Sequence, residues 1–333
     1  MRETATDGSG SEGSSASENP HVDKKQPGAL VRLFRIVLIF YIAVFALRFF
    51  APFWWLADLF SHFPLQGFLS GIVLIVAGLC VRKKNLVLAT CLMTCWYAYE
   101  LLPYVPSVTD PPASPGAKSL LVWNVYVGNR DKATLIEAVR AAEADYVLLL
   151  ETDERWDAAL ASLDGEYPHR SAITEGAFGI SFLSREPVES VKIEDIGEKL
   201  INTVIAELPG GVTLYGVHCF PPRGAEYSRI RNQQIGELIN EVETNSGPVI
   251  VAGDLNVSPW SPHFSKLTAS GRLRDLRKGR GLINTWPAHN LIVRTPIDHV
   301  LPSEQIEVHS FERLPDACGS DHFGLLFRYS VRE

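Results

Sequence analysis

The stretch LLVWNVYVGN (residues 120–129) and the run DYVLLLET (145–152) decide the fold expected for this chain. Each is an apolar run of β type that delivers one polar side chain, Asn124 in the first and Glu151 at the end of the second. Between them lies ATLIEAVRAAEA (133–144), whose large apolar residues recur at helical spacing. The pattern predicts a strand–helix–strand unit.

Further apolar runs extend this unit into a larger β structure. A second long helix is expected at 226–243, where apolar residues fall on one side. Many strands with few helices are typical of an α+β protein that has two sheets with helices outside them. The additional strands are expected at 178–183, 202–207, 212–218, 248–252, 297–301 and 323–329.

Polar residues also mark the ends of the later strands. Taken singly, each has a structural explanation, such as a turn for GDLN, a strand-end histidine or a Ser-Asp cap for SDH. Their joint order indicates a site for metal-assisted hydrolysis of a phosphoester, because carboxylates and amides bind hard cations and a histidine oriented by a carboxylate moves protons. The residues are His218 in LYGVHCFPP, Asp254 and Asn256 in VIVAGDLNVSPWS, Asp298 in PIDHVL, and Asp321 and His322 in GSDHFGLLF.

The first third of the chain has a different composition. Residues 1–28 are rich in Ser, Gly, Glu and Asp and are expected to be a disordered tail. Residues 29–103 are expected to be an all-helical membrane region, since a bilayer is crossed by about 20 apolar residues. Residues 104–117 form a Pro-rich linker, expected to act as a semi-rigid tether before a globular domain at 118–333. The three expected transmembrane helices are 33–50, 64–81 and 85–102. A buried or interfacial helix is the alternative for the third.

The basic residues near these spans predict an orientation. Lys24, Lys25 and Arg32 precede the first span, and 82–84 between the second and third spans is basic, whereas 51–63 contains no Lys or Arg. The positive-inside rule then places the N-terminus in the cytoplasm and the globular domain outside it, in a multi-pass protein of the cell membrane.

The net charge bears on the class of substrate, and the cysteines bear on a possible disulfide. The net charge of −7 argues against a general duplex-DNA binder, which usually presents a basic face. The basic run at 272–280 is interpreted as a solvated loop, with a headgroup-facing patch as the alternative. Cys219 and Cys318 could pair outside the cytoplasm or remain buried free thiols.

Residues 118–333 resemble the endonuclease/exonuclease/phosphatase superfamily, also called deoxyribonuclease I-like, particularly its bacterial membrane-tethered members. The likeness rests on WNV, LLLET, FLSREP, VHCFPP, GDLNVSPWS, TWP, PIDHVL and GSDHFG in this order. It implies a four-layer α/β/β/α sandwich. It also implies Mg²⁺ as the cofactor, with Mn²⁺ as an alternative, and a phosphoester substrate.

The resemblance also implies a role for each residue. Glu151 would be the main metal ligand, with Asn124 near the metal or phosphate and Asp321 completing the metal region. Asp254 would orient or activate water. Asn256, His218 and Asn124 would bind phosphate, and His322, hydrogen-bonded to Asp298, would contact the scissile phosphate; which group is base and which is acid stays open. Tyr126 stands where abasic-site endonucleases have an acidic residue, a departure that disfavours that branch.

The sequence is compatible with three functions. The first is a phosphodiesterase or nuclease, the second a sphingomyelinase- or phosphoinositide-phosphatase-like lipid hydrolase, and the third a catalytically silent membrane-tethered binding module. The expected partners are the substrate and, through the helices, the lipid bilayer; no protein partner can be inferred. Four aromatic residues, Trp260, His263, Trp286 and His289, are either rim residues that could stack on bases or packing residues.

Overall fold

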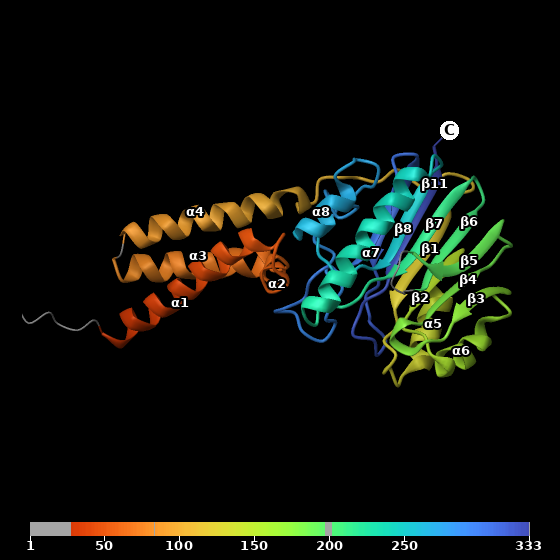
Figure 1. Ribbon diagram of the computed structural model, residues 1–333, viewed down its shortest axis with the longest axis horizontal. Helices are drawn as coiled ribbons and strands as arrows, with labels where there is room; N and C mark the ends of the chain where they lie inside the picture. Colours follow the sequence, from red (N-terminus) through yellow and green to blue (C-terminus); the bar gives the residue numbers. More distant parts are fainter. Residues whose placement is uncertain (1–27, 83, 197–201, 333) are drawn as a thin grey trace, which may run out of the picture.

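The computed structural model describes residues 28–82, 84–196 and 202–332. The disordered tail expected at 1–28 lies outside the described residues, apart from Gly28. The described chain forms a helical arm (residues 29–104) that projects from one end of a two-sheet sandwich (Figure 1).

Two sheets form the centre of the sandwich. In the described part of the chain, one sheet has the strand order β10-β11-β1-β2-β4-β3 and the other has the order β5-β6-β7-β8-β9. The strands are β1 (Lys118–Asn124), β2 (Tyr146–Leu150), β3 (His169–Ile173), β4 (Ile180–Ser184), β5 (Ser190–Asp195), β6 (Asn202–Leu208), β7 (Val212–His218), β8 (Val249–Asp254), β9 (Asp298–Pro302), β10 (Ile306–Arg313) and β11 (Leu325–Val331).

Each sheet contains one parallel pair near its centre, β1 with β2 and β7 with β8. Both faces of these strands are covered, which explains why their sequences are continuous apolar runs rather than alternating ones. Successive side chains point to opposite faces. In β2, Leu148 and Leu150 pack between the sheets, whereas Val147 and Leu149 pack outward against helices.

Helices form the two outer layers. Leu135 of α5 (Lys132–Ala142) and Trp156 of α6 (Glu154–Leu160) pack on the six-stranded sheet. Leu238 of α7 (Ala225–Thr244) and Phe264 of α8 (Pro262–Thr268) pack on the five-stranded sheet. Helix α5 begins at a capping residue, Asp131, whose side chain accepts a hydrogen bond from the backbone N–H of Thr134. A 3₁₀ turn, Ala161–Leu163, follows α6, and another, Gly176–Phe178, joins β3 to β4.

The α+β four-layer prediction is therefore confirmed, whereas several short elements were not predicted. The sequences of β3 and β5 are mixed and half exposed, so they carry no clear alternation. In β10, the register shifts between Val308 and Ser310, which interrupts the period of two. Helices α6 and α8 are each only seven residues long.

The helical arm turns its apolar side chains outward. It comprises α1, α2, α3 and α4 with two 3₁₀ turns, and Leu33, Ile36 and Phe40 of α1 are exposed. Two helices, Ala29–Phe50 and Lys84–Tyr104, are long and apolar enough to cross a membrane. The span expected at 64–81 is α3, which follows α2 at a bend of 69° and counts as a third span only if the bent pair is one unit. The bounds are α1 (Ala29–Leu47), Arg48–Phe50, α2 (Trp55–Ser61), α3 (Pro64–Cys80), α4 (Lys84–Leu101) and Leu102–Tyr104.

Helix α2, which lies in the connection expected at 51–63, packs on the sandwich through buried polar groups. The Asp58 carboxylate accepts from Arg231 of α7 at 2.6 Å and from the Ser261 hydroxyl at 2.7 Å. His62 Nδ1 lies 2.7 Å from Ser258 Oγ and accepts from the Ser258 backbone N–H at 3.2 Å. Because such groups are costly to bury unless they are paired, this contact fixes one arrangement of arm and sandwich.

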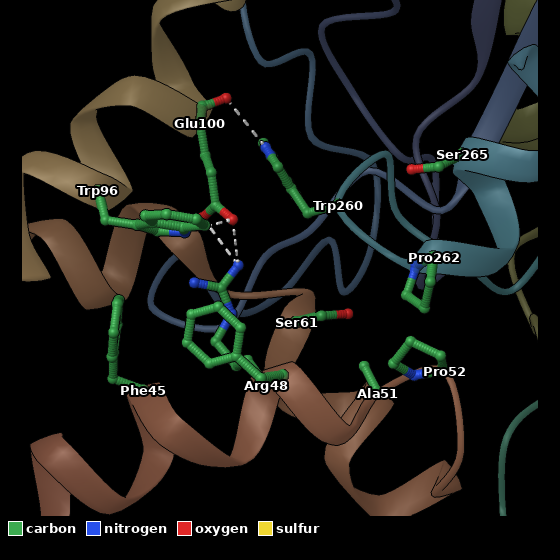
Figure 2. Close-up of a pocket in the computed structure, with 11 residues that line it drawn as sticks. Phe45, Arg48, Ala51, Pro52, Ser61, Trp96, Glu100, Trp260, Pro262 and Ser265 are labelled. Atoms are coloured by element: carbon green, nitrogen blue, oxygen red, sulfur yellow. Dashed lines mark hydrogen bonds and ion pairs between the residues drawn. The ribbon is translucent and has the colours of Figure 1, made fainter.

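A second contact joins the end of the arm to the sandwich. Figure 2 shows Arg48 of the arm paired with Glu100 at 2.8 Å, while the Trp260 indole N–H donates to the Glu100 carbonyl oxygen at 3.2 Å. Tyr104 donates to Asp275 at 3.1 Å. Arg48 and Glu100, which lie near the ends of two expected spans, are thus paired with each other at the junction.

The start of the linker meets the basic run on the sandwich, and the environment of this run differs from the expected one. The backbone N–H groups of 107 and 108 donate to the Gly279 carbonyl, so this part of the linker lies against the sandwich. Within the run at 272–280, Arg277 is buried and Arg280 pairs with Asp110. Lys278 is the only exposed residue of the run. Neither the solvated loop nor the headgroup patch describes these arginines.

The two cysteines of the sandwich are free thiols on opposite outer layers. Cys219 packs with the helices of the five-stranded sheet and Cys318 with those of the six-stranded sheet. The pairing alternative is therefore wrong for this structure.

Replacing Arg231 with Met should destabilise the full chain strongly. The substitution leaves the Asp58 carboxylate, which is 1% exposed, without its cation, and breaking a buried pair in this way costs about 3–5 kcal/mol. Denaturant unfolding in detergent measures the loss. The matched control is Arg229→Met, whose ion pair with Glu226 is exposed and should cost less than about 1 kcal/mol. Equal losses would contradict the importance of the buried contact.

Candidate active site

The register of the sheets brings the polar strand ends together. His218 of β7 is paired with Asp254 of β8, and Asp254 is paired with Asp298 of β9, so the three residues form one row. In the other sheet, Asn124 ends β1 and Glu151 follows the adjacent β2. The carboxyl ends of neighbouring parallel strands meet at one edge, which is a common place for ligand sites.

Asn124 connects the two rows. Its side-chain amide donates to Glu151 Oε1 at 3.1 Å and to Asp254 Oδ2 at 3.2 Å. Its own oxygen accepts from the backbone N–H of Tyr126 at 3.1 Å, and the second oxygen of Glu151 accepts from the backbone N–H of Val127 at 3.1 Å. One amide thus holds carboxylates from both sheets in fixed positions.

Two of the site residues have left-handed backbone conformations. Glu151 has φ 64° and Asn256 has φ 50°, values that are costly for residues other than glycine and that cluster at functional sites. Glu151 N–H donates to the Gly179 carbonyl at 2.9 Å. A Cβ at Gly179 would lie 1.7 Å from the carbonyl oxygen of Thr152, so only glycine permits this close approach.

Asn256 is held at both its backbone and its side chain. Its backbone N–H donates to Asp254 Oδ1 at 2.8 Å, and its side-chain amide donates to the Cys219 carbonyl at 2.8 Å. Arg231 donates to the Asn256 carbonyl at 3.1 Å. The guanidinium that binds Asp58 of the arm therefore also supports this site residue.

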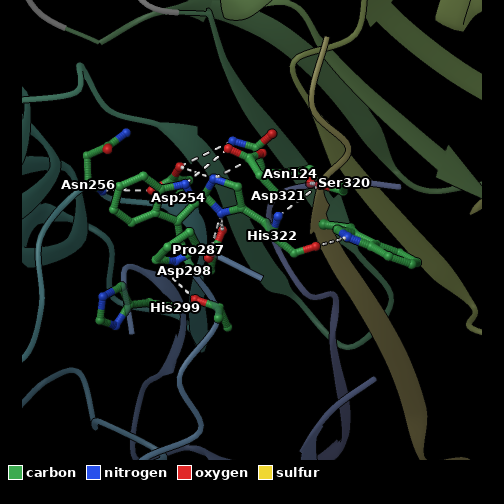
Figure 3. A network of polar contacts seen from close by, with 12 residues as sticks. Asn124, Asp254, Asn256, Pro287, Asp298, His299, Ser320, Asp321 and His322 are labelled. Atoms are coloured by element: carbon green, nitrogen blue, oxygen red, sulfur yellow. Dashed lines mark hydrogen bonds and ion pairs between the residues drawn. The ribbon is translucent and has the colours of Figure 1, made fainter. Parts of the chain in front are cut away.

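His322 is oriented by a carboxylate (Figure 3). Its Nδ1 lies 2.9 Å from Asp298 Oδ2, and its Nε2 lies 3.8 Å from Asp254 Oδ2. Its backbone carbonyl accepts from the Trp123 indole at 2.9 Å, and its backbone N–H donates to Ser320 Oγ at 3.0 Å. The imidazole is thus fixed from both its ring and its backbone.

The two histidines differ in electrostatic environment. Burial opposes charge on His322, but Asp298, with Asp254 and Asp321, outweighs it and raises the pKa of His322 to about 10. Burial lowers the pKa of His218, against the opposing effect of Glu151. Burial and the neighbouring Asp298 raise the pKa of Asp254 well above its usual range. A protonated and a neutral imidazole in one site can divide the roles of donor and acceptor.

Asp321 completes the group from the C-terminal side. Its Oδ2 accepts from the Trp286 indole at 3.1 Å, whereas its Oδ1 is buried without a hydrogen-bond partner among the described residues. Oδ1 lies 3.9 Å from His322 Nε2. An unpartnered carboxylate oxygen that faces other acidic groups has the chemistry of a cation ligand.

Two sets of residues could hold a metal ion. Ligand atoms of Asp254, Asp298 and His322 lie within 4.8 Å of one another. Asp298 and His322 are already hydrogen-bonded to each other, however, so a cation there would have to break that pair. The oxygens of Glu151 and Asp321 retain free lone pairs, and Asn124 offers its remaining lone pair. This oxygen-rich set fits a hard divalent cation better.

Five of the eight residues singled out in the sequence line one pocket, and the other three contact residues of this group. The pocket has a volume of about 420 Å³. Glu151, His218, Asn256, Asp321 and His322 line it, and Asn124, Asp254 and Asp298 join them through the contacts above.

The pocket also has a wall that the sequence did not predict. Leu59, His62 and Phe63 line it from the α2–α3 turn of the helical arm. The signal in the sequence was the pair of polar residues, Asp58 and His62, within an otherwise apolar segment.

Of the four aromatic residues considered as a rim, one reaches the pocket. Trp286 lines it, whereas Trp260 packs against Tyr104 of the arm. His263 is buried beside Asn232, and His289 is exposed outside the residues that line the pocket. A base-stacking rim built from all four is therefore not present.

Known proteins share this fold. A UPF0294 protein of Vibrio vulnificus (strain CMCP6) is 28% identical over 234 residues, which cover 65% of this chain and 78% of the relative. TDP2 of D. rerio, solved in complex with a single strand DNA product, has a TM-score of 0.55 at 17% identity and covers 65% of this chain and 100% of its own. The 3′ phosphatase NExo from Neisseria, bound to a product DNA hairpin, has a TM-score of 0.52 at 16% identity, with 64% and 100% covered.

These solved structures show the fold alone. The family is shown by the sequence itself, because residues 121–322 match the model of a family whose members are hydrolases acting on phosphoesters. The chain belongs to the endonuclease/exonuclease/phosphatase family.

Proposed function

We propose that this chain is a membrane-anchored, divalent-metal-dependent phosphoester hydrolase that cleaves a P–O bond with an activated water molecule. The observation that carries the proposal is a pocket lined by Glu151 and His322, with Asp298 and Asp254 in contact with these residues or linked to them through Asn124. A binding module would not require a carboxylate-oriented histidine beside two further carboxylates.

The donor set suits Mg²⁺, with Mn²⁺ as a substitute, held by Glu151 and Asp321 with Asn124 beside them. When bound, the cation neutralises charge on the phosphate and on the leaving oxygen. Oxygen ligands from carboxylates, together with retained waters, are what Mg²⁺ prefers.

The protein groups carry the proton transfers. The Nδ1 of His322 is bound to Asp298, so its Nε2 faces the pocket. His322 donates the proton on Nε2 to a phosphate oxygen. Asp254, between the two imidazoles, orients the attacking water and takes its proton. His218, which is neutral, and Asn256, which is bound to Asp254 and Cys219, contact the phosphate.

The helical arm supplies the anchor. In Figure 1 the start of α1 and the turn between α3 and α4 lie at the end far from the sandwich. Arg32, Arg35, Arg82 and Lys84 belong to that end, so the positive-inside rule assigns it to the cytoplasm and the sandwich to the opposite side.

Glu151→Gln should lower metal-dependent hydrolysis of bis-p-nitrophenyl phosphate by the full chain at least about a hundredfold, more than loss of an outer contact to a metal site usually costs. Mn²⁺ binding, followed by electron paramagnetic resonance, should weaken in parallel. Glu154→Gln is the matched control, because Glu154 is exposed on the next helix. Retained Mn²⁺ binding in Glu151→Gln would remove Glu151 from the ligand set.

Asp298→Asn should reduce turnover by about 10²–10⁴-fold, the usual contribution of a positioned acid or base, while Mn²⁺ affinity stays nearly constant. An amide lacks the charge that keeps the His322 imidazole protonated and can present its N–H to the ring. Asp164→Asn, on an exposed turn, serves as the control. If both variants turn over at the parent rate, His322 does not act through Asp298.

Reporter fusions after the last residue test the orientation. Alkaline phosphatase, which is active only outside the cytoplasm, should be active when fused there, and β-galactosidase should be inactive. The opposite pattern would place the catalytic pocket in the cytoplasm and overturn the proposed topology.

A further inference from the structure

An apolar groove of the helical arm lies next to the catalytic pocket. The groove has a volume of about 530 Å³ and runs between α1 and α3. Phe63, at the start of α3, lines both the groove and the catalytic pocket. We call this feature the arm groove; its walls include Val37, Phe40 and Val44 of α1 and Leu69, Ser70 and Val73 of α3.

The length of the arm groove matches one leaflet of a bilayer. From Phe63 to Val73 the chain advances ten helical residues, which at 1.5 Å each span roughly 15 Å. The hydrocarbon core of a bilayer is about 30 Å thick, so this is about half its depth. A hydrocarbon chain from the leaflet next to the sandwich could lie along the arm groove with its polar end at Phe63.

The sandwich presents apolar residues on the same side. Leu291 and Ile292 are each 78% exposed, and the Ile292 carbonyl accepts a hydrogen bond from Gln66 of α3 at 2.8 Å. Gln66 also lines the arm groove. Exposed large apolar side chains next to a membrane helix are suited to contact with lipid rather than water. In the proposed membrane-anchored arrangement, this side of the sandwich faces the bilayer.

The arm also offers a polar group to the pocket. Ser258 N–H donates to His62 Nδ1, so the His62 proton lies on Nε2. This Nε2 is buried without a hydrogen-bond partner among the described residues, and His62 lines the catalytic pocket. A free donor beside Phe63 fits a phosphate or ester oxygen at the point where the hydrocarbon chain ends.

We infer that the substrate is a lipid phosphodiester, whose hydrocarbon chain lies in the arm groove while its phosphate lies between Glu151 and His322. This inference rests on the proposed hydrolase activity. The water oxygen forms a new bond to phosphorus, the bond from phosphorus to one ester oxygen breaks, and that oxygen takes up a proton as the alcohol leaves. The proton lost by water passes to the protein base. A nucleic-acid strand has no chain to place in the groove, and the net charge of −7 opposes its approach.

The test uses the full chain in vesicles of phosphatidylethanolamine and phosphatidylglycerol. Turnover of phosphatidylglycerol, sphingomyelin and a phosphoinositide is compared with that of single-stranded DNA and of soluble bis-p-nitrophenyl phosphate. Comparison of the turnover of the three lipids identifies the preferred headgroup. At a constant headgroup, long-chain lipids should be hydrolysed faster than short-chain ones, because only long chains fill the arm groove.

Ser70→Trp fills the arm groove and should lower the ratio of lipid to soluble-diester turnover at least about tenfold, which is the effect of losing contact with roughly two methylene groups. Ile72→Trp is the matched control, since Ile72 is exposed on α3 but does not line the groove. The control should leave the ratio unchanged.

A direct measurement covers the case in which Ser70→Trp fails to fold. Photoactivatable phosphatidylglycerol with a diazirine in its acyl chain should label peptides that contain Phe40 and Val73 in the parent chain, and competing long-chain lipid should reduce the labelling.

The outcomes separate the two proposals. Hydrolysis of the soluble diester with no lipid turnover, faster turnover of DNA than of every lipid, or an equal ratio in Ser70→Trp and Ile72→Trp would overturn the lipid inference alone. Absence of turnover on all substrates with Mg²⁺ or Mn²⁺ would overturn the proposed function itself.

Discussion

Two buried carboxylates held side by side, Asp254 and Asp298, are the constraint on which the site depends. In a medium of low dielectric constant their repulsion is strong, and neither has water to offset it. Three groups offset this repulsion. His322 lies between the two carboxylates, and the Asn124 amide donates to Asp254. The Arg277 guanidinium donates to the backbone carbonyl of Asp298. The excess of negative charge that remains toward the pocket is what makes it a favourable place for a divalent cation.

The sequence predicts Asp254, Asp298 and His322 of this group, though not Arg277, because these three residues stand at the ends of apolar runs. Strands covered on both faces have continuous apolar sequences. A polar residue at the end of such a run is therefore easily recognised and is expected at the end of the strand. In the structure, the parallel pairing of β7 with β8, on either side of α7 in the chain, places His218 directly beside Asp254. The same reasoning applies to Asn124 and Glu151 in the other sheet.

The packing of the arm on the sandwich could not be predicted in this way. Asp58 and Arg231 are 173 residues apart, and in the sequence each resembles a surface charge, one in a short connection and one on an amphipathic helix. Only the tertiary structure makes them a buried pair. Arg277 was misjudged for the same reason, since a run of basic residues carries no sign that one of them will lie under the site. Strand β10 was missed because its bulge breaks the alternation on which a strand is recognised.

The buried pair gives the arm a part in the site. Arg231 binds Asp58 through one guanidinium nitrogen and the Asn256 carbonyl through another, so the position of α2 and the position of a pocket residue depend on the same side chain. A fragment without the arm would lose the wall formed by Phe63 and the Asp58 carboxylate that binds Arg231, close to Asn256. The arm and the sandwich are therefore one functional unit, and the chemistry of the pocket has to be measured on the full chain.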